Sequence, residues 1–144
     1  MGLQANWFVW AVFSAVFAAL TAILAKIGIE GVNSDLATLI STAVILVVLA
    51  AFVWLTGAWT NPARLSGKTL GFLAASALAT GASWVCYFRA LKVGNASNVA
   101  PVDKLSVVLV ALFAMMFLGE RPTGREWLGI GLIGAGVVIM SIRK

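Results

Sequence analysis

Five long apolar stretches, separated by short polar segments, constrain the fold of this chain more than any other feature. A bilayer core of about 30 Å needs about 20 helical residues for one crossing, which is close to the length of each stretch. The apolar runs are continuous and lack the period-two alternation of a transmembrane β-barrel. We therefore predict an all-α integral membrane protein, a single domain over residues 1–144 with five transmembrane helices. The predicted helices cover residues 7–29, 36–56, 69–91, 96–118 and 127–142.

The composition agrees with this fold class. Hydrophobic residues make up 62% of the chain and charged residues only 10%, and the mean hydropathy is +1.04. A soluble protein of this size exposes far more charge. The segment Met1–Asn6 carries no Lys or Arg, and the apolar run after it is too long for a signal-peptide core. We expect this run to be retained as the first helix, in the inner membrane.

Several function classes are excluded by residues that the sequence lacks. It contains no His, so His-based zinc sites and Ser-His or Cys-His catalysis are excluded, and its one cysteine, Cys86, cannot form an intrachain disulfide. No glycine-rich phosphate loop followed by Lys is present. The formal net charge is +5, but the basic residues lie at helix ends, where lipid head groups meet them, and do not form a run. We predict no enzyme activity, no cofactor, no metal and no nucleic-acid partner.

An adjacent charge pair, Asp103-Lys104, lies inside the fourth apolar stretch. A charge at membrane depth is costly, so the pair is a candidate functional site. Pro101 can start or kink a helix, which leaves two interpretations open. In one, the helix begins at Pro101, Asp103 lies in its first turn at the interface, and Lys104 reaches outward. In the other, the chain enters the membrane near Ala96, Asp103 lies about 10 Å deep, and a broken helix faces a polar cavity.

The expected partners of this pair come from helix geometry. Consecutive residues point about 100° apart on a helix, so we expect Asp103 and Lys104 each to need another partner. Lys26 near the end of the first helix is the predicted partner of Asp103, and Lys104 is predicted to face the solute or a second chain.

A group of aromatic and hydroxyl side chains on the third helix is predicted to line the same cavity. Trp84 and Tyr87 share one helix face, and Ser83 and Thr80 can extend this wall. Anchoring at the lipid interface is the alternative for the two aromatic residues, and helix-to-helix hydrogen bonding is the alternative for the two hydroxyls.

Small residues mark two helix faces that another helix can approach closely. On the third helix they are Gly71, Ala75 and Ala79, and on the fifth Gly129, Gly131, Gly134, Ala135 and Gly136. We predict that these faces pack against other helices of the same chain or of a partner.

Positive charge is nearly balanced between the two membrane sides. The N-terminal side holds Arg64, Lys68, Arg121 and Arg125, and the C-terminal side holds Arg89, Lys92, Arg143 and Lys144. Positive loop charges set orientation, so an even count sets it weakly. In one outcome, the chain inserts in both directions and two copies pair antiparallel. In the other, Lys26 and Lys104 add fully to the positive charge of the C-terminal side, and that side is cytoplasmic.

A recognisable pattern runs through four segments, Ala90–Gly94, Val99–Pro101, Leu118–Glu120 and Gly129–Gly136. In this order, they resemble the EamA-type repeat of the drug/metabolite transporter superfamily, and the resemblance covers essentially the whole chain. Two further segments, Leu24–Gly28 and Ala100–Ser106, look most like the short five-helix bacterial and archaeal branch. Most members carry two such repeats in one chain, so a single repeat implies a dimer. The related small multidrug resistance proteins couple to protons through a first-helix Glu. This chain has Lys26 in that helix, so their mechanism is not carried over.

Together these observations predict a secondary transporter that moves a small metabolite or drug-like solute by alternating access, as a homodimer in the lipid bilayer. The alternative is a non-transporting membrane subunit that docks a partner through its glycine-rich last helix.

Overall fold

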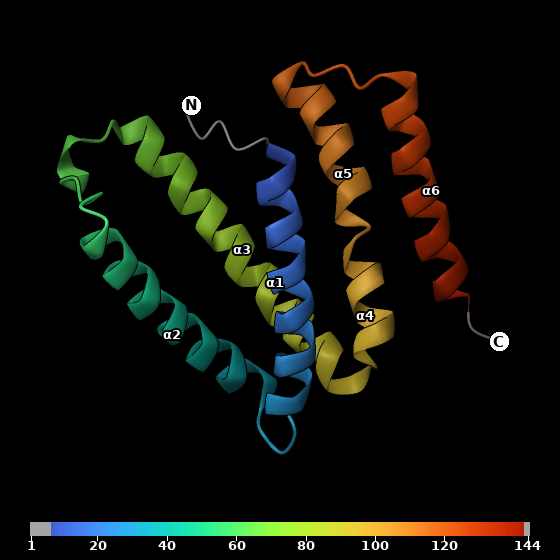
Figure 1. Cartoon of the computed structure of the whole chain (residues 1–144), viewed down its shortest axis with the longest axis horizontal. Helices are drawn as coiled ribbons and strands as arrows, with labels where there is room; N and C mark the ends of the chain where they lie inside the picture. The colour runs from blue at the N-terminus through green and yellow to red at the C-terminus, as the bar shows by residue number, and fades with distance from the viewer. Residues whose placement is uncertain (1–6, 143–144) are drawn as a thin grey trace. The chain divides into compact units, whose positions relative to one another are not determined.

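The computed structural model describes residues 7–142, which are helical almost throughout and contain no strand (Figure 1). The helices are α1 (Trp7–Gly28), α2 (Ser34–Leu55), η1 (Pro62–Arg64), α3 (Gly67–Val93), α4 (Ala96–Asp103), α5 (Ser106–Phe113), η2 (Ala114–Leu118) and α6 (Gly124–Ser141). The predicted all-α fold is confirmed. The fourth apolar stretch, however, is divided between α4, α5 and the single wide turn η2.

Four segments are long and apolar enough to cross a membrane. They are Trp7–Gly28, Ser34–Leu55, Gly67–Val93 and Ala96–Leu118, the last of which includes α4, α5 and η2. The fifth helix, α6, has 18 residues and is not among them. A crossing by α6 remains a prediction.

One compact unit comprises residues 27–93 and is built on the contact between α2 and α3. Asn33 begins α2, and its side-chain oxygen accepts from the amides of Asp35 (2.8 Å) and Leu36 (3.4 Å). This cap satisfies amides that have no partner inside the helix. Ile29, Phe88 and Leu91 are the buried apolar residues of this unit.

The other unit comprises residues 1–26 and 94–144, of which the structure describes 7–26 and 94–142. In it, α6 packs along both α4 and α5. Thr123 and Glu126 form a reciprocal cap at the start of α6: the Thr123 amide donates to the Glu126 carboxylate at 2.6 Å, and the Glu126 amide donates to the Thr123 hydroxyl at 3.4 Å. This cap fixes where α6 begins, immediately before its apolar face.

At Gly134, α6 lies close to α5. A Cβ atom built on Gly134 would lie 3.2 Å from Cγ2 of Val108, whereas nothing lies within 4 Å of the same position at Gly129, Gly131 or Gly136. The predicted close approach on the last helix is therefore seen at Gly134. The other three glycines of this face are open within the described chain.

Candidate functional site

The candidate site lies where the fourth apolar stretch changes direction between α4 and α5 (Figure 1). Here the amides of Lys104 and Leu105 donate to carbonyls only three residues back, each at 3.0 Å. The Val107 amide does the same to the Lys104 carbonyl at 3.0 Å. Hydrogen bonds of this spacing tighten the backbone and break the regular α-helical ladder.

Pro101 contributes to this break because it lies inside α4. Proline has no amide hydrogen, so the carbonyl of Ser97 loses its regular intrahelical donor, and the ring crowds that carbonyl. Pro101 thus weakens α4 from within and does not begin the helix, which starts at Ala96. The interpretation that places Asp103 in the first turn of a helix is wrong: Asp103 is the last residue of α4.

Asp103 and Lys104 pair with each other. The Nζ atom of Lys104 lies 3.4 Å from Oδ2 of Asp103, and the two side chains are 54% and 39% exposed, respectively. The expectation that neighbouring positions on a helix cannot pair is wrong here. The flexible lysine stem is long enough to reach the neighbouring carboxylate despite the angular offset between consecutive residues.

Lys26 has a different contact from the one predicted. Its Nζ atom donates to the Gly94 carbonyl at 2.8 Å, just before α4 begins. A lysine near a helix end that binds a free main-chain carbonyl is a common way to satisfy such groups.

The unit of residues 27–93 contains a charged cluster that the sequence analysis missed. Arg89 on α3 donates two parallel hydrogen bonds to Asp35 on α2, from Nε to Oδ1 and from Nη2 to Oδ2, each 2.9 Å long. Lys92 donates to the carbonyls of Ile29 (2.9 Å) and Val32 (2.7 Å), between α1 and α2. A bidentate arginine–carboxylate contact fixes the relative orientation of the two side chains as well as their distance. This cluster therefore holds the end of α3 against the beginning of α2.

The predicted aromatic and hydroxyl wall lies on α3. Trp84 and Tyr87 are half-buried, and Ser83 is exposed. The Thr80 hydroxyl donates to the Ser76 carbonyl of its own helix at 2.9 Å. These four residues belong to the unit of residues 27–93, whereas Lys26, Asp103 and Lys104 belong to the other unit. A site shared by the two groups remains a prediction.

The predicted packing face of α3 is open in this chain. Gly71, Ala75 and Ala79 are exposed, and nothing lies within 4 Å of a Cβ atom built on Gly71. On α6, Ala135 is exposed as well. Use of these faces by a second copy therefore remains a prediction.

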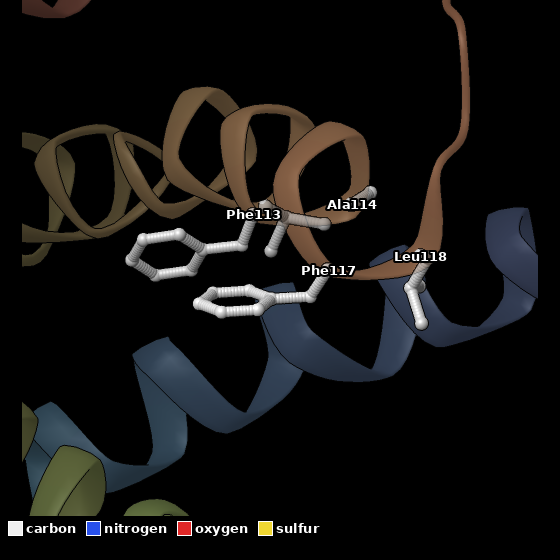
Figure 2. A pocket seen from close by; sticks show the side chains of 5 residues that line it. Phe113, Ala114, Phe117 and Leu118 are labelled. Atoms are coloured by element: carbon white, nitrogen blue, oxygen red, sulfur yellow. The ribbon is translucent and has the colours of Figure 1, made fainter.

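A shallow apolar groove lies at the far end of the same stretch (Figure 2). Its volume is about 290 Å³, and it is lined by Val110, Phe113, Ala114, Phe117 and Leu118. The rings of Phe113 and Phe117 lie 6.1 Å apart at 54° and point in the same direction. The groove contains none of the predicted site residues and has no polar group that could bind a charged solute.

Among the described residues, no group of three or more Asp, Glu and Cys side chains could hold a metal ion. The charged groups at the break itself, Asp103 and Lys104, form one contact of 3.4 Å.

Comparison with known proteins gives the chain its family. The model of the EamA-like transporter family matches residues 5–142. A protein of a Sinorhizobium species, described as an uncharacterized transporter in the cobO 3′ region, is 54% identical over 140 residues, which cover 97% of this chain and 99% of that protein. No solved structure matches the chain.

A second group of relatives carries a more specific name. The probable 4-amino-4-deoxy-L-arabinose-phosphoundecaprenol flippase subunits ArnE of Yersinia pestis and Yersinia pseudotuberculosis are 36% identical over 84 residues, which cover 58% of this chain and 74% of each relative. These names and the family match point to membrane transport and away from an enzyme. Matched almost from end to end, the chain is a multi-pass membrane protein that belongs to the EamA-like transporter family.

Proposed function

We propose that this chain is a secondary transporter that moves a small solute with a polar head across the bacterial inner membrane by alternating access, as a homodimer. The observation that carries the proposal is the Asp103–Lys104 pair at the break between α4 and α5. Within Ala96–Leu118, these are the only charged residues, and they lie about 10 Å from Ala96 at 1.5 Å per helical residue. Polar groups at such depth are tolerated where water or protein reaches them, as in the broken helices of transporters.

The dimer is proposed because one chain has little interior to offer. The buried apolar residues of the described chain are few, namely Ala22, Ile29, Phe88, Leu91, Ala111 and Val137. Polar groups in a lipid-facing position need another helix beside them, and a second copy supplies five. The open glycines of α6 offer one face for it, since small residues let helix backbones approach closely.

The orientation of the two copies depends on charge. The even count of loop cations favours insertion in both directions and antiparallel pairing. The contact of Lys26 with the Gly94 carbonyl favours the other outcome, because it keeps this cation near the chain segment that follows α3. Reporter fusions at the C-terminus decide between them: activity on both sides of the membrane supports antiparallel copies, and activity on one side refutes them.

The transport proposal is tested by reconstituting the purified chain in vesicles and following the uptake of a panel of labelled polar solutes. Asp103→Asn is expected to abolish the uptake that the wild type supports. The matched control is Glu120→Gln, a carboxylate in the turn after η2, which should transport normally. Equal uptake by the wild type and Asp103→Asn, or no uptake of any solute above empty vesicles, would refute the proposal.

A second function is suggested by the names of the relatives. The Yersinia proteins are named as subunits of a flippase, so the chain can instead serve as one subunit of an assembly with a different membrane protein. In that case the open face of α6 would bind this other protein. A purified chain that forms dimers and transports without any other component refutes the subunit role, whereas one that needs a second protein supports it.

A further inference from the structure

Two groups of charged side chains in residues 7–142 differ in how firmly they are held. Arg89 and Asp35 share two contacts of 2.9 Å, and Lys92 donates to two carbonyls at 2.7 and 2.9 Å. The Asp103–Lys104 contact is single and long, at 3.4 Å. Within residues 7–142, the structure gives these two side chains no other hydrogen bond or ion pair. The firmly held group stabilises the fold, and the loosely held pair is available for exchange.

We propose that this pair is a self-neutralised recognition site for a zwitterionic solute, one that carries both an ammonium group and a phosphate or carboxylate. The ammonium group of the solute binds Asp103, and its anionic group binds Lys104. Two contacts with the solute thus replace the contact between the two side chains. This inference rests on the proposed transport function and names the class of solute.

The charge balance of the site selects a solute with both signs. At the proposed membrane depth, removing one partner from an ion pair leaves an unpaired charge, which is strongly unfavourable. A solute with a single charge can replace only one partner and leaves the other unpaired. A solute with both charge signs gives each side chain an opposite charge, so neither is left unpaired.

The backbone adds a reason why Asp103 accepts a second cation. Asp103 is the last residue of α4, where the helix dipole presents its negative end. A carboxylate is disfavoured there unless a cation approaches it, and Lys104 provides only one long contact. An ammonium group from a solute would make a shorter, charge-assisted hydrogen bond, typically about 2.7–2.9 Å.

The experiment measures binding separately from transport, by calorimetry on the purified full-length chain in nanodiscs. The probes are phosphoethanolamine, ethanolamine and inorganic phosphate. Because each charged end of the solute adds a charge-assisted hydrogen bond, phosphoethanolamine is expected to bind at least about tenfold more tightly than either probe with one charge sign. Equal affinities for the three probes would overturn the proposal.

Variants assign each charge to its partner. Asp103→Asn should abolish the advantage over phosphate, and Lys104→Gln should abolish the advantage over ethanolamine. If either single variant fails to fold, the neutral double variant with both changes leaves no unpaired charge and is expected to fold without a zwitterion preference. The exchanged variant, Asp103→Lys with Lys104→Asp, should regain part of the preference, since the solute can bind in the reverse direction. A preference that survives in the neutral double variant refutes the assignment.

The same chemistry occurs in free solutes and in lipid head groups, and a second arm distinguishes them. Vesicles carry acyl-labelled phosphatidylethanolamine or acyl-labelled phosphatidylglycerol, which lacks the amine. Faster movement of the first lipid across the bilayer identifies a head-group substrate, and phosphoethanolamine uptake without lipid movement identifies a free solute. Zwitterion binding without transport of either kind would refute the proposed function and leave the recognition site intact.

Discussion

The close approach of α6 to α5 at Gly134 gives the most quantitative prediction. An alanine Cβ atom at this position would lie 3.2 Å from Cγ2 of Val108, whereas carbon atoms pack best at about 3.5–4.0 Å. Val108 is β-branched and lies within α5, so its side chain has essentially one favourable rotamer and cannot turn away. The strain therefore falls on the separation of α5 and α6.

The expected size follows from two opposing terms. Overpacking by one methyl group costs about 1–3 kcal/mol. Alanine also favours a helix over glycine by about 1 kcal/mol. Gly134→Ala should therefore lower the free energy of unfolding by about 0–2 kcal/mol, through the sum of the two terms. The matched control is Gly81→Ala in α3, where nothing lies within 4 Å of the new Cβ atom and only the favourable term applies.

The assay is reversible unfolding in mixed detergent micelles, followed by the fluorescence of the tryptophans. Gly134→Ala should be less stable than Gly81→Ala by about 1–3 kcal/mol, because the helix-propensity term cancels between them. Equal shifts of the two variants would refute the close packing of α6 on α5. This packing matters for the site, since Val108 lies one turn after the break and α6 contacts the helices on both sides of it.

Three further predictions concern the helix ends. Arg89→Lys removes the bidentate contact with Asp35 and should lower the yield of folded protein in detergent. The control, Arg64→Lys in η1, should leave the yield unchanged. Equal yields of the two variants would refute the importance of the bidentate contact. Thr123→Ala removes the cap of α6 and should reduce unfolding free energy by about 1 kcal/mol, measured in the same micelles; an unchanged value would refute the cap. The Thr123 amide and hydroxyl hold the pKa of the Glu126 carboxyl below its usual value. The stability from this contact is therefore fully present above the ordinary glutamate pKa and is lost as the pH falls through the lowered one. Acid unfolding should be less steep in Glu126→Gln, and identical acid profiles would contradict this.

The helical fold could be predicted from the sequence because it depends on local patterns. Continuous apolar runs of bilayer length need helices to satisfy their backbone groups, whatever packs beside them. The Thr123–Glu126 cap also has a local signature, a threonine followed three residues later by a glutamate, and could have been found. Pro101 predicted an irregular fourth helix. The position of the break could not be predicted, because it comes one turn after the proline and not at it.

The contacts of the charged residues could not be predicted, because they join distant parts of the chain. Arg89 and Asp35 are 54 residues apart, and Lys26 and Gly94 are 68 apart. Helical spacing says on which face a residue lies but not which carbonyl a long lysine stem reaches. The prediction for Lys26 considered only acidic partners. It overlooked main-chain carbonyls beyond helix ends. For a lysine ammonium group, such carbonyls are hydrogen-bond acceptors comparable to a carboxylate.

Main-chain carbonyls beyond helix ends explain why some charged side chains are firmly held and the Asp103–Lys104 pair is not. The last carbonyls of each helix have no intrahelical donor, and in an apolar surrounding each of them needs one. Lys26 and Lys92 lie near the ends of α1 and α3 and donate to main-chain carbonyls, so their charge is used in completing the backbone. Lys104 is different, since the tightened turn around it already satisfies the carbonyls of Pro101 and Val102 through main-chain amides. Among the described residues its ammonium group therefore contacts Asp103 alone, which is the arrangement that the proposed solute site requires.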